Sequence, residues 1–216
     1  MAPKKKIAVK RQVWNKGLRV GKREGFTPAQ VKRIRDVLAD RGVPGLRDLA
    51  LFSLAIDTML RGPELLDLTV KDVQIPNGTI RSVIKVARPR GKPPLRCALS
   101  EKTAKALGRW IAVSGVKGTD YIFPGQDAGR PRPMSGRQLH RLLKFWVTEA
   151  GLDPKKYSNE SLRRTKALHI LNSTGDLETV RALLGHEKIE STSHYLSVAS
   201  IAKKSDPIAI SRAFDI

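Results

Sequence analysis

Residues 44–60, PGLRDLALFSLAIDTML, carry apolar side chains on most sides of a helix. Such a helix is typical of an element that is covered by others on several sides. The segment therefore predicts a helical domain built around one buried helix. Arg61 follows directly, and Pro63 marks the first turn of a new helix in RGPELLDL. We expect Arg61 at the junction of these two helices and not on a solvated face.

Local start and stop signals predict helices along most of the remaining chain. In FTPAQVKRIRDVLADRG, Thr27 is a candidate N-cap, Pro28 the first helical residue and Gly42 a stop. Residues 31, 34, 37 and 38 give this helix one apolar face. Further helices are predicted at residues 100–113, 135–150, 161–171 and, behind the N-cap candidate Asp176, 177–184.

A single region favours β-structure. An Asn77-Gly78 turn signal precedes the β-branched run in IRSVIKV, and a second strand is expected at LRCALS. The intervening ARPRGKPP, rich in Pro and Gly, predicts a loop that directs Arg88, Arg90 and Lys92 outward. The expected fold class is mostly α with a small antiparallel β-sheet (α+β).

The charge balance points to a polyphosphate partner. Lys and Arg number 41 against 20 Asp and Glu, which gives a net charge of +21 and favours nucleic acid over a merely basic soluble protein. Residues 1–26 lack periodicity and contain Lys4, Lys5 and Lys6, which predicts either a flexible arm that binds phosphates or a nuclear-targeting signal. The single cysteine, Cys97, excludes an internal disulfide. Without a signal peptide or a long apolar run, the protein is expected in the cytoplasm, associated with the nucleoid.

The segment SNESLRRTKALHILNSTGDLETVRALLGHEKIESTSHYL holds the informative polar residues. Arg163 and Arg164 begin one helix, and Gly185 ends the next and leaves His186 at its edge. Tyr195 belongs to a third element, so it can meet His186 only through tertiary folding. Taken alone, such a tyrosine is usually a packing residue and such a histidine a partner of the helix dipole.

Together with Arg61, these residues suit DNA strand transfer. A tyrosine oxygen can remain bonded to phosphorus without a metal. Two arginines offer bidentate donors to the extra negative charge of the transition state, a histidine adds another donor, and a lysine can protonate the departing 5′ oxygen.

The order LRGPELLDL, a hairpin with a basic turn, LRRT, LLGH and a tyrosine nine residues later resembles the catalytic domain of tyrosine recombinases, the phage integrase family. The resemblance covers about residues 27–198 and implies a helical domain with a three-stranded sheet. It implies that Arg61 and Arg163 are the two arginines, His186 the second histidine-type residue and Tyr195 the nucleophile.

The resemblance further implies a site-specific recombinase that forms a 3′-phosphotyrosyl intermediate, with no cofactor and no metal. Its partner would be double-stranded DNA, bound by a homotetramer, with Arg88, Arg90 and Arg164 among the DNA contacts. The short arm would replace in part the separate N-terminal domain with which longer members clamp the DNA. Residues 199–216 would dock on a neighbouring protomer or pack on their own domain.

Two positions depart from the family pattern. Glu160 stands where the family usually has histidine. An ionised carboxylate there would repel the phosphate, so Glu160 is expected to be protonated, turned toward an arginine, or harmful to catalysis. A gapless comparison puts Arg90 at the position of the hairpin lysine, and Lys92 lies two residues on. Arginine is a poor general acid, which favours Lys92.

Three other functions compete. The departures favour a noncatalytic DNA-binding relative that assists recombination, and similar chemistry would serve a type IB topoisomerase. A zinc enzyme is disfavoured because HEKIE has Glu190 in place of the second histidine of H-E-x-x-H.

Overall fold

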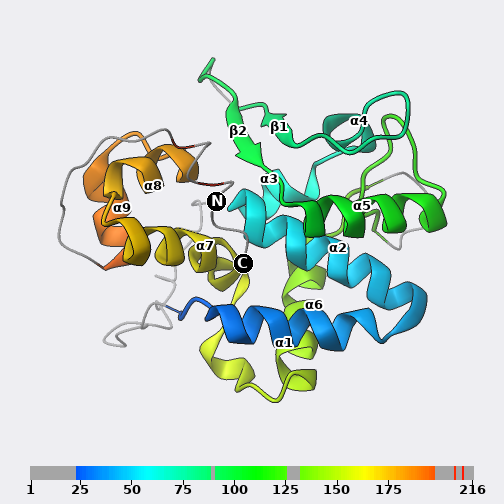
Figure 1. Cartoon of the computed structure of the whole chain (residues 1–216), viewed down its shortest axis with the longest axis horizontal. Helices are drawn as coiled ribbons and strands as arrows, with labels where there is room; N and C mark the ends of the chain where they lie inside the picture. The colour runs from blue at the N-terminus through cyan, green and yellow to red at the C-terminus, as the bar shows by residue number, and fades with distance from the viewer. Residues whose placement is uncertain (1–22, 89–90, 126–131, 198–206, 208–210, 212–216) are drawn as a thin grey trace, which may run out of the picture.

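The computed structural model describes residues 23–88, 91–125, 132–197, 207 and 211 (Figure 1). Helices dominate, and the expected fold class, mostly α with a small antiparallel sheet, is confirmed. Lys4, Lys5, Lys6 and Arg90 lie outside the described residues. The elements are α1 (Pro28–Ala39), α2 (Gly42–Thr58), α3 (Gly62–Leu66), α4 (Val70–Val73), β1 (Val83–Val86), β2 (Leu95–Ala98), α5 (Glu101–Ser114), α6 (Gly136–Glu149), the 3-10 turn η1 (Pro154–Lys156), α7 (Asn159–Thr174), α8 (Leu177–Leu184) and α9 (Ile189–Leu196).

Helix α2 is the buried centre that its sequence predicts. It contacts α1, α5, α7 and β2, and Figure 1 shows it running through the middle of the molecule. Phe52 packs edge-on against Trp146 of α6, with ring centroids 5.8 Å apart. Burying side chains of this size on every side of α2 provides the main hydrophobic stabilisation of the domain.

The predicted caps of the outer helices are present. The Thr27 hydroxyl accepts from the Gln30 backbone N–H, and the Gln30 side chain accepts in return from the Thr27 N–H. Asp176 likewise caps α8 through the Thr179 N–H at 2.8 Å. Helix α1 ends earlier than the predicted stop, at Ala39 with Asp40 as its C-cap, and Gly42, in a left-handed conformation (φ 62°), is the first residue of α2.

The sheet is smaller than the resemblance implies. Strands β1 and β2 pair antiparallel from Val83 opposite Ala98 to Val86 opposite Leu95. A third strand is absent from the described residues, where Gln74 and Ile80 form an isolated bridge. The pairing stops at this bridge because Val73, the residue before Gln74, is already the last residue of helix α4.

Helices α7, α8 and α9 form a second apolar cluster on the left of Figure 1. A buried ion pair ties α7 to α2: Lys166 Nζ lies 3.4 Å from Asp57 Oδ1, and both side chains are 1% exposed. The other oxygen of Asp57 accepts from the Ser100 N–H. These contacts fix α7 rigidly on the central helix. Within the described residues, the helices are too short or too polar to cross a membrane.

Candidate active site

A cleft of about 710 Å³ opens between the start of α3, the β1–β2 hairpin and helices α7 to α9. Most of the residues selected from the sequence line it, namely Arg61, Arg88, Lys92, Glu160, Arg164, His186 and Tyr195. The structure also places there residues that the sequence did not single out, among them Arg23, Ser158, Lys188, Ser191 and His194. Cations from several separate segments therefore face one space.

Arg163 lies beneath the cleft and is held by main-chain oxygens. Its Nη1 donates to the Met59 carbonyl and its Nη2 to the Leu184 carbonyl, both at 2.8 Å. These carbonyls belong to the C-terminal ends of α2 and α8, where helix dipoles favour a cation. Burial lowers the pKa of Arg163, whose side chain is 4% exposed. A buried guanidinium thus fixes two helix ends relative to each other.

His186 is positioned by the end of α8. Gly185 takes a left-handed conformation (φ 66°) that stops the helix, and the His186 N–H bonds to the Arg181 carbonyl. The ring contacts Arg163 Nη2 through Nε2 at 3.4 Å and Thr192 Oγ1 through Nδ1 at 3.0 Å. Burial, followed by the charge of Arg163, lowers the pKa of His186 to about 4.

The neutral ring has a defined tautomer. Since an arginine can only donate, Nε2 of His186 must be the acceptor toward Arg163. The proton then resides on Nδ1 and is donated to the Thr192 hydroxyl. In this state the single lone pair of Nε2 is directed to Arg163.

Tyr195 of α9 contacts Glu160 and His186 at the cleft. Its hydroxyl donates to Glu160 Oε2 at 2.9 Å, and its ring meets the His186 ring edge-on with centroids 5.5 Å apart. The guanidinium carbons of Arg164 and Arg163 lie 5.4 and 5.9 Å from the ring centroid. Burial first, and then the negative charge of Glu160, raise the pKa of Tyr195 above its ordinary value.

Arg61 precedes α3, at the predicted helix junction. Its N–H donates to Glu64 Oε2 at 2.9 Å, and its guanidinium pairs with Glu64 Oε1 at 3.4 Å. Glu64 also lies 4.0 Å from Arg163 and so links the two arginines. The sequence reasoning missed Glu64, although a glutamate three residues after a helix start is the signal of such a cap.

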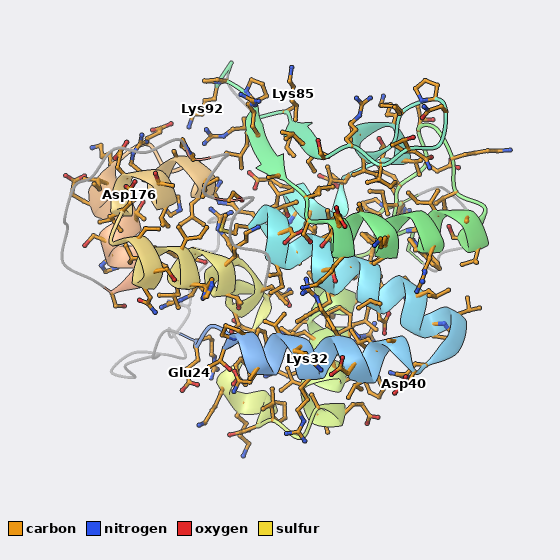
Figure 2. The ribbon with its side chains drawn as sticks, in the orientation of Figure 1. Glu24, Lys32, Asp40, Lys85, Lys92 and Asp176 are labelled. Carbon is orange, nitrogen blue, oxygen red and sulfur yellow. The ribbon has the colours of Figure 1, made fainter. Side chains whose placement is uncertain are left out.

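The hairpin cations lie nearer the domain than expected. Lys92, seen near the hairpin end in Figure 2, forms an ion pair with Glu187. The expectation that Arg88 points outward is wrong. The Arg88 guanidinium donates to the Gly185 carbonyl at 2.6 Å. The carbonyl at the C-terminal end of α8 attracts the guanidinium. The hairpin is therefore attached on both sides of His186.

Comparisons of the sequence with a family model and with curated proteins indicate the same family. The model of the phage integrase family matches residues 24–200. The tyrosine recombinase XerD of Vibrio vulnificus strain YJ016 is 33% identical over 170 residues, 76% of this chain and 54% of its own. XerD of Xanthomonas campestris is 34% identical over 170 residues, 73% of this chain and 50% of its own. The chain thus spans about half the length of these curated relatives.

Solved structures share the fold. The XerH site-specific recombinase bound to a palindromic difH substrate superposes with a TM-score of 0.66 at 19% identity, covering 82% of this chain and 50% of that one. The catalytic domain of bacteriophage HP1 integrase gives 0.53 at 19% identity, covering 81% and 87%. The family model matches residues 24–200, which is most of this chain, and the chain therefore belongs to the phage integrase family.

Proposed function

We propose that this chain is a site-specific DNA recombinase that cleaves and rejoins strands through a 3′-phosphotyrosyl link at Tyr195. The observation that carries the proposal is the convergence of Tyr195, His186 and Arg163 from three elements beneath one cationic cleft. A phosphodiester in this cleft would meet a nucleophile and fixed donors together. No step requires a nucleotide cofactor or a metal ion.

Each side chain has a separate task in the proposed reaction. Arg61 and Arg163 bind the nonbridging oxygens, and Nη1 of Arg163 keeps one N–H beyond its bond to the Met59 carbonyl. His186 donates to the same phosphate from Nε2 once that nitrogen takes up a proton, because the phosphate charge offsets that of Arg163. Lys92, once released from Glu187, donates a proton to the leaving 5′ oxygen. Arg90 is the alternative for that position, although its guanidinium holds its proton too tightly to be an effective acid.

The partner is double-stranded DNA, and the reaction is proposed to occur in the cytoplasm on a homotetramer. The charge of +21 supports a polyanionic partner. XerH was solved on difH DNA, and the Tn1549 integrase on circular intermediate DNA. In this proposal residues 27–198 form the catalytic domain, with Arg88 and Arg164 contacting the backbone. Residues 1–26 add an arm carrying Lys4, Lys5 and Lys6, and residues 199–216 a docking tail.

Covalent capture tests the proposal even when the target sequence is unidentified. Wild type is incubated with a pool of nicked duplexes that have a randomised centre, and DNA that stays bound under denaturing conditions is recovered and sequenced. We expect wild type to enrich a defined site and Tyr195→Phe to capture nothing. Capture by Tyr195→Phe at the wild-type level would contradict the proposal.

A second candidate is a DNA-binding relative whose catalysis is impaired. The contact that favours it is Tyr195 to Glu160, since burial and the negative charge of Glu160 raise the pKa of Tyr195 and so disfavour the phenolate that attacks phosphorus. Such a protein would enrich a site in noncovalent selection from the same pool and give no covalent product.

A further inference from the structure

The hydroxyl of Tyr195 has a defined acceptor. It donates to Oε2 of Glu160 at 2.9 Å, a distance suited to proton transfer. Glu160 is exposed and lies in the first turn of the long helix α7.

We propose that Glu160 is the proton acceptor for Tyr195 during strand cleavage. The inference rests on the proposed function and adds a chemical role at the position where the family usually has histidine. As Tyr195 Oη bonds to phosphorus, its proton passes to Glu160 Oε2. The bond from phosphorus to the 5′ oxygen breaks, and that oxygen takes its proton from Lys92. On rejoining, Glu160 returns the proton to Tyr195.

The other groups around Tyr195 are poor acceptors. From α7, Arg163 and Arg164 face the ring, and arginines offer no lone pair. From the turn before α9, His186 meets the ring through its edge, with Nε2 directed to Arg163 and Nδ1 to the hydroxyl of Thr192. Among the described residues that contact Tyr195, the carboxylate of Glu160 is the group suited to accept its proton.

Arg164 completes this arrangement. It follows Glu160 by four residues on α7, so the two side chains lie on the same helix face. Its guanidinium carbon lies 5.4 Å from the Tyr195 ring, where a positive charge favours the developing phenolate. Glu160 thus removes the proton while Arg164 stabilises the charge that remains.

The test measures single-turnover cleavage against pH on the captured DNA site. Glu160→Gln keeps the size and the hydrogen-bonding oxygen of the side chain but removes its basicity. We expect it to slow cleavage about 10²- to 10⁴-fold, with DNA affinity equal or tighter. The matched control is Glu190→Gln, which removes an exposed carboxylate from α9, and its rate should equal that of wild type.

Two further arms separate proton acceptance from other roles. Glu160→His supplies a different base, so cleavage should persist while its pH limb moves to about 6.5, the ordinary imidazole value. A substrate with sulfur in place of the 5′ bridging oxygen has a leaving group that needs no acid. It should rescue Lys92→Ala and leave Glu160→Gln slow.

Each contrary result has a distinct meaning. If wild type forms no covalent product, the proposed function fails, and the inference fails with it. If wild type cleaves and Glu160→Gln matches its rate and pH profile, the inference alone is overturned. Rescue of Glu160→Gln by the sulfur substrate would also overturn it, because Glu160 would then act at the leaving group. Faster cleavage by Glu160→Gln would overturn it as well, because the carboxylate would then be an inhibitor.

Discussion

Replacing Arg163 with alanine should destabilise the fold as well as remove the phosphate ligand that we propose. The guanidinium donates to the buried Met59 and Leu184 carbonyls at 2.8 Å, and its side chain is 4% exposed. A buried carbonyl left without a donor costs about 1–3 kcal/mol. Two such groups, less the relief from no longer burying a cation, give a loss of about 2–5 kcal/mol in the free energy of unfolding.

Urea unfolding followed by tryptophan fluorescence measures this loss, since Trp146 is fully buried. At about 2–4 °C per kcal/mol for a chain of this size, Tm should fall by about 4–20 °C. The control is Arg61→Ala, because its half-exposed side chain pairs with Glu64 at 3.4 Å and should contribute less than about 1 kcal/mol. Equal losses in the two variants, or a loss below about 1 kcal/mol in Arg163→Ala, would refute the helix-linking role.

Three other changes follow from the contacts. Lys166→Met should lower the free energy of unfolding by about 3–5 kcal/mol because it leaves Asp57 charged and buried. In the same urea assay, the double variant with Asp57→Asn should recover part of the lost free energy of unfolding. The pKa of His186 falls from 6.5 to about 4 in the folded chain, so its contribution to stability is present above pH 6.5 and is lost as the pH falls toward 4. In His186→Gln the urea midpoint should therefore depend less on pH over that range. A pH dependence of the midpoint equal to that of wild type would contradict the pKa shift. Glu187→Gln should release Lys92 and tighten DNA binding a few-fold in a low-salt titration, whereas weaker binding would show that Glu187 positions the lysine.

The sequence predicted the fold well where the signals are local. Thr27 and Asp176 cap their helices as expected because capping depends on a few neighbouring residues. The short helices α4 and η1 were missed, since segments of three or four residues have no measurable periodicity. The two-strand sheet differs from the three strands implied by resemblance because helix α4 extends to Val73 and leaves only Gln74 to pair with Ile80.

The site was predictable as a set of residues but not as a set of contacts. Tyr195 and His186 were selected from the motif, and the structure brings their rings together. That Arg163 would bind main-chain carbonyls and Arg88 would turn back onto Gly185 depends on how helix ends meet in space. The hydrogen bond from Tyr195 to Glu160 likewise joins residues 35 positions apart, and no local pattern predicts that these two side chains meet.

The most direct test of the account is to map the DNA attachment on the protein. The covalent product is digested with trypsin and a nuclease, and the peptide that carries the nucleotide remnant is sequenced by mass spectrometry. Of the three tyrosines in the chain, the peptide of residues 189–203 contains Tyr195 alone. The account predicts the remnant on this peptide, at Tyr195. A remnant on Tyr121, Tyr157 or a serine would contradict it.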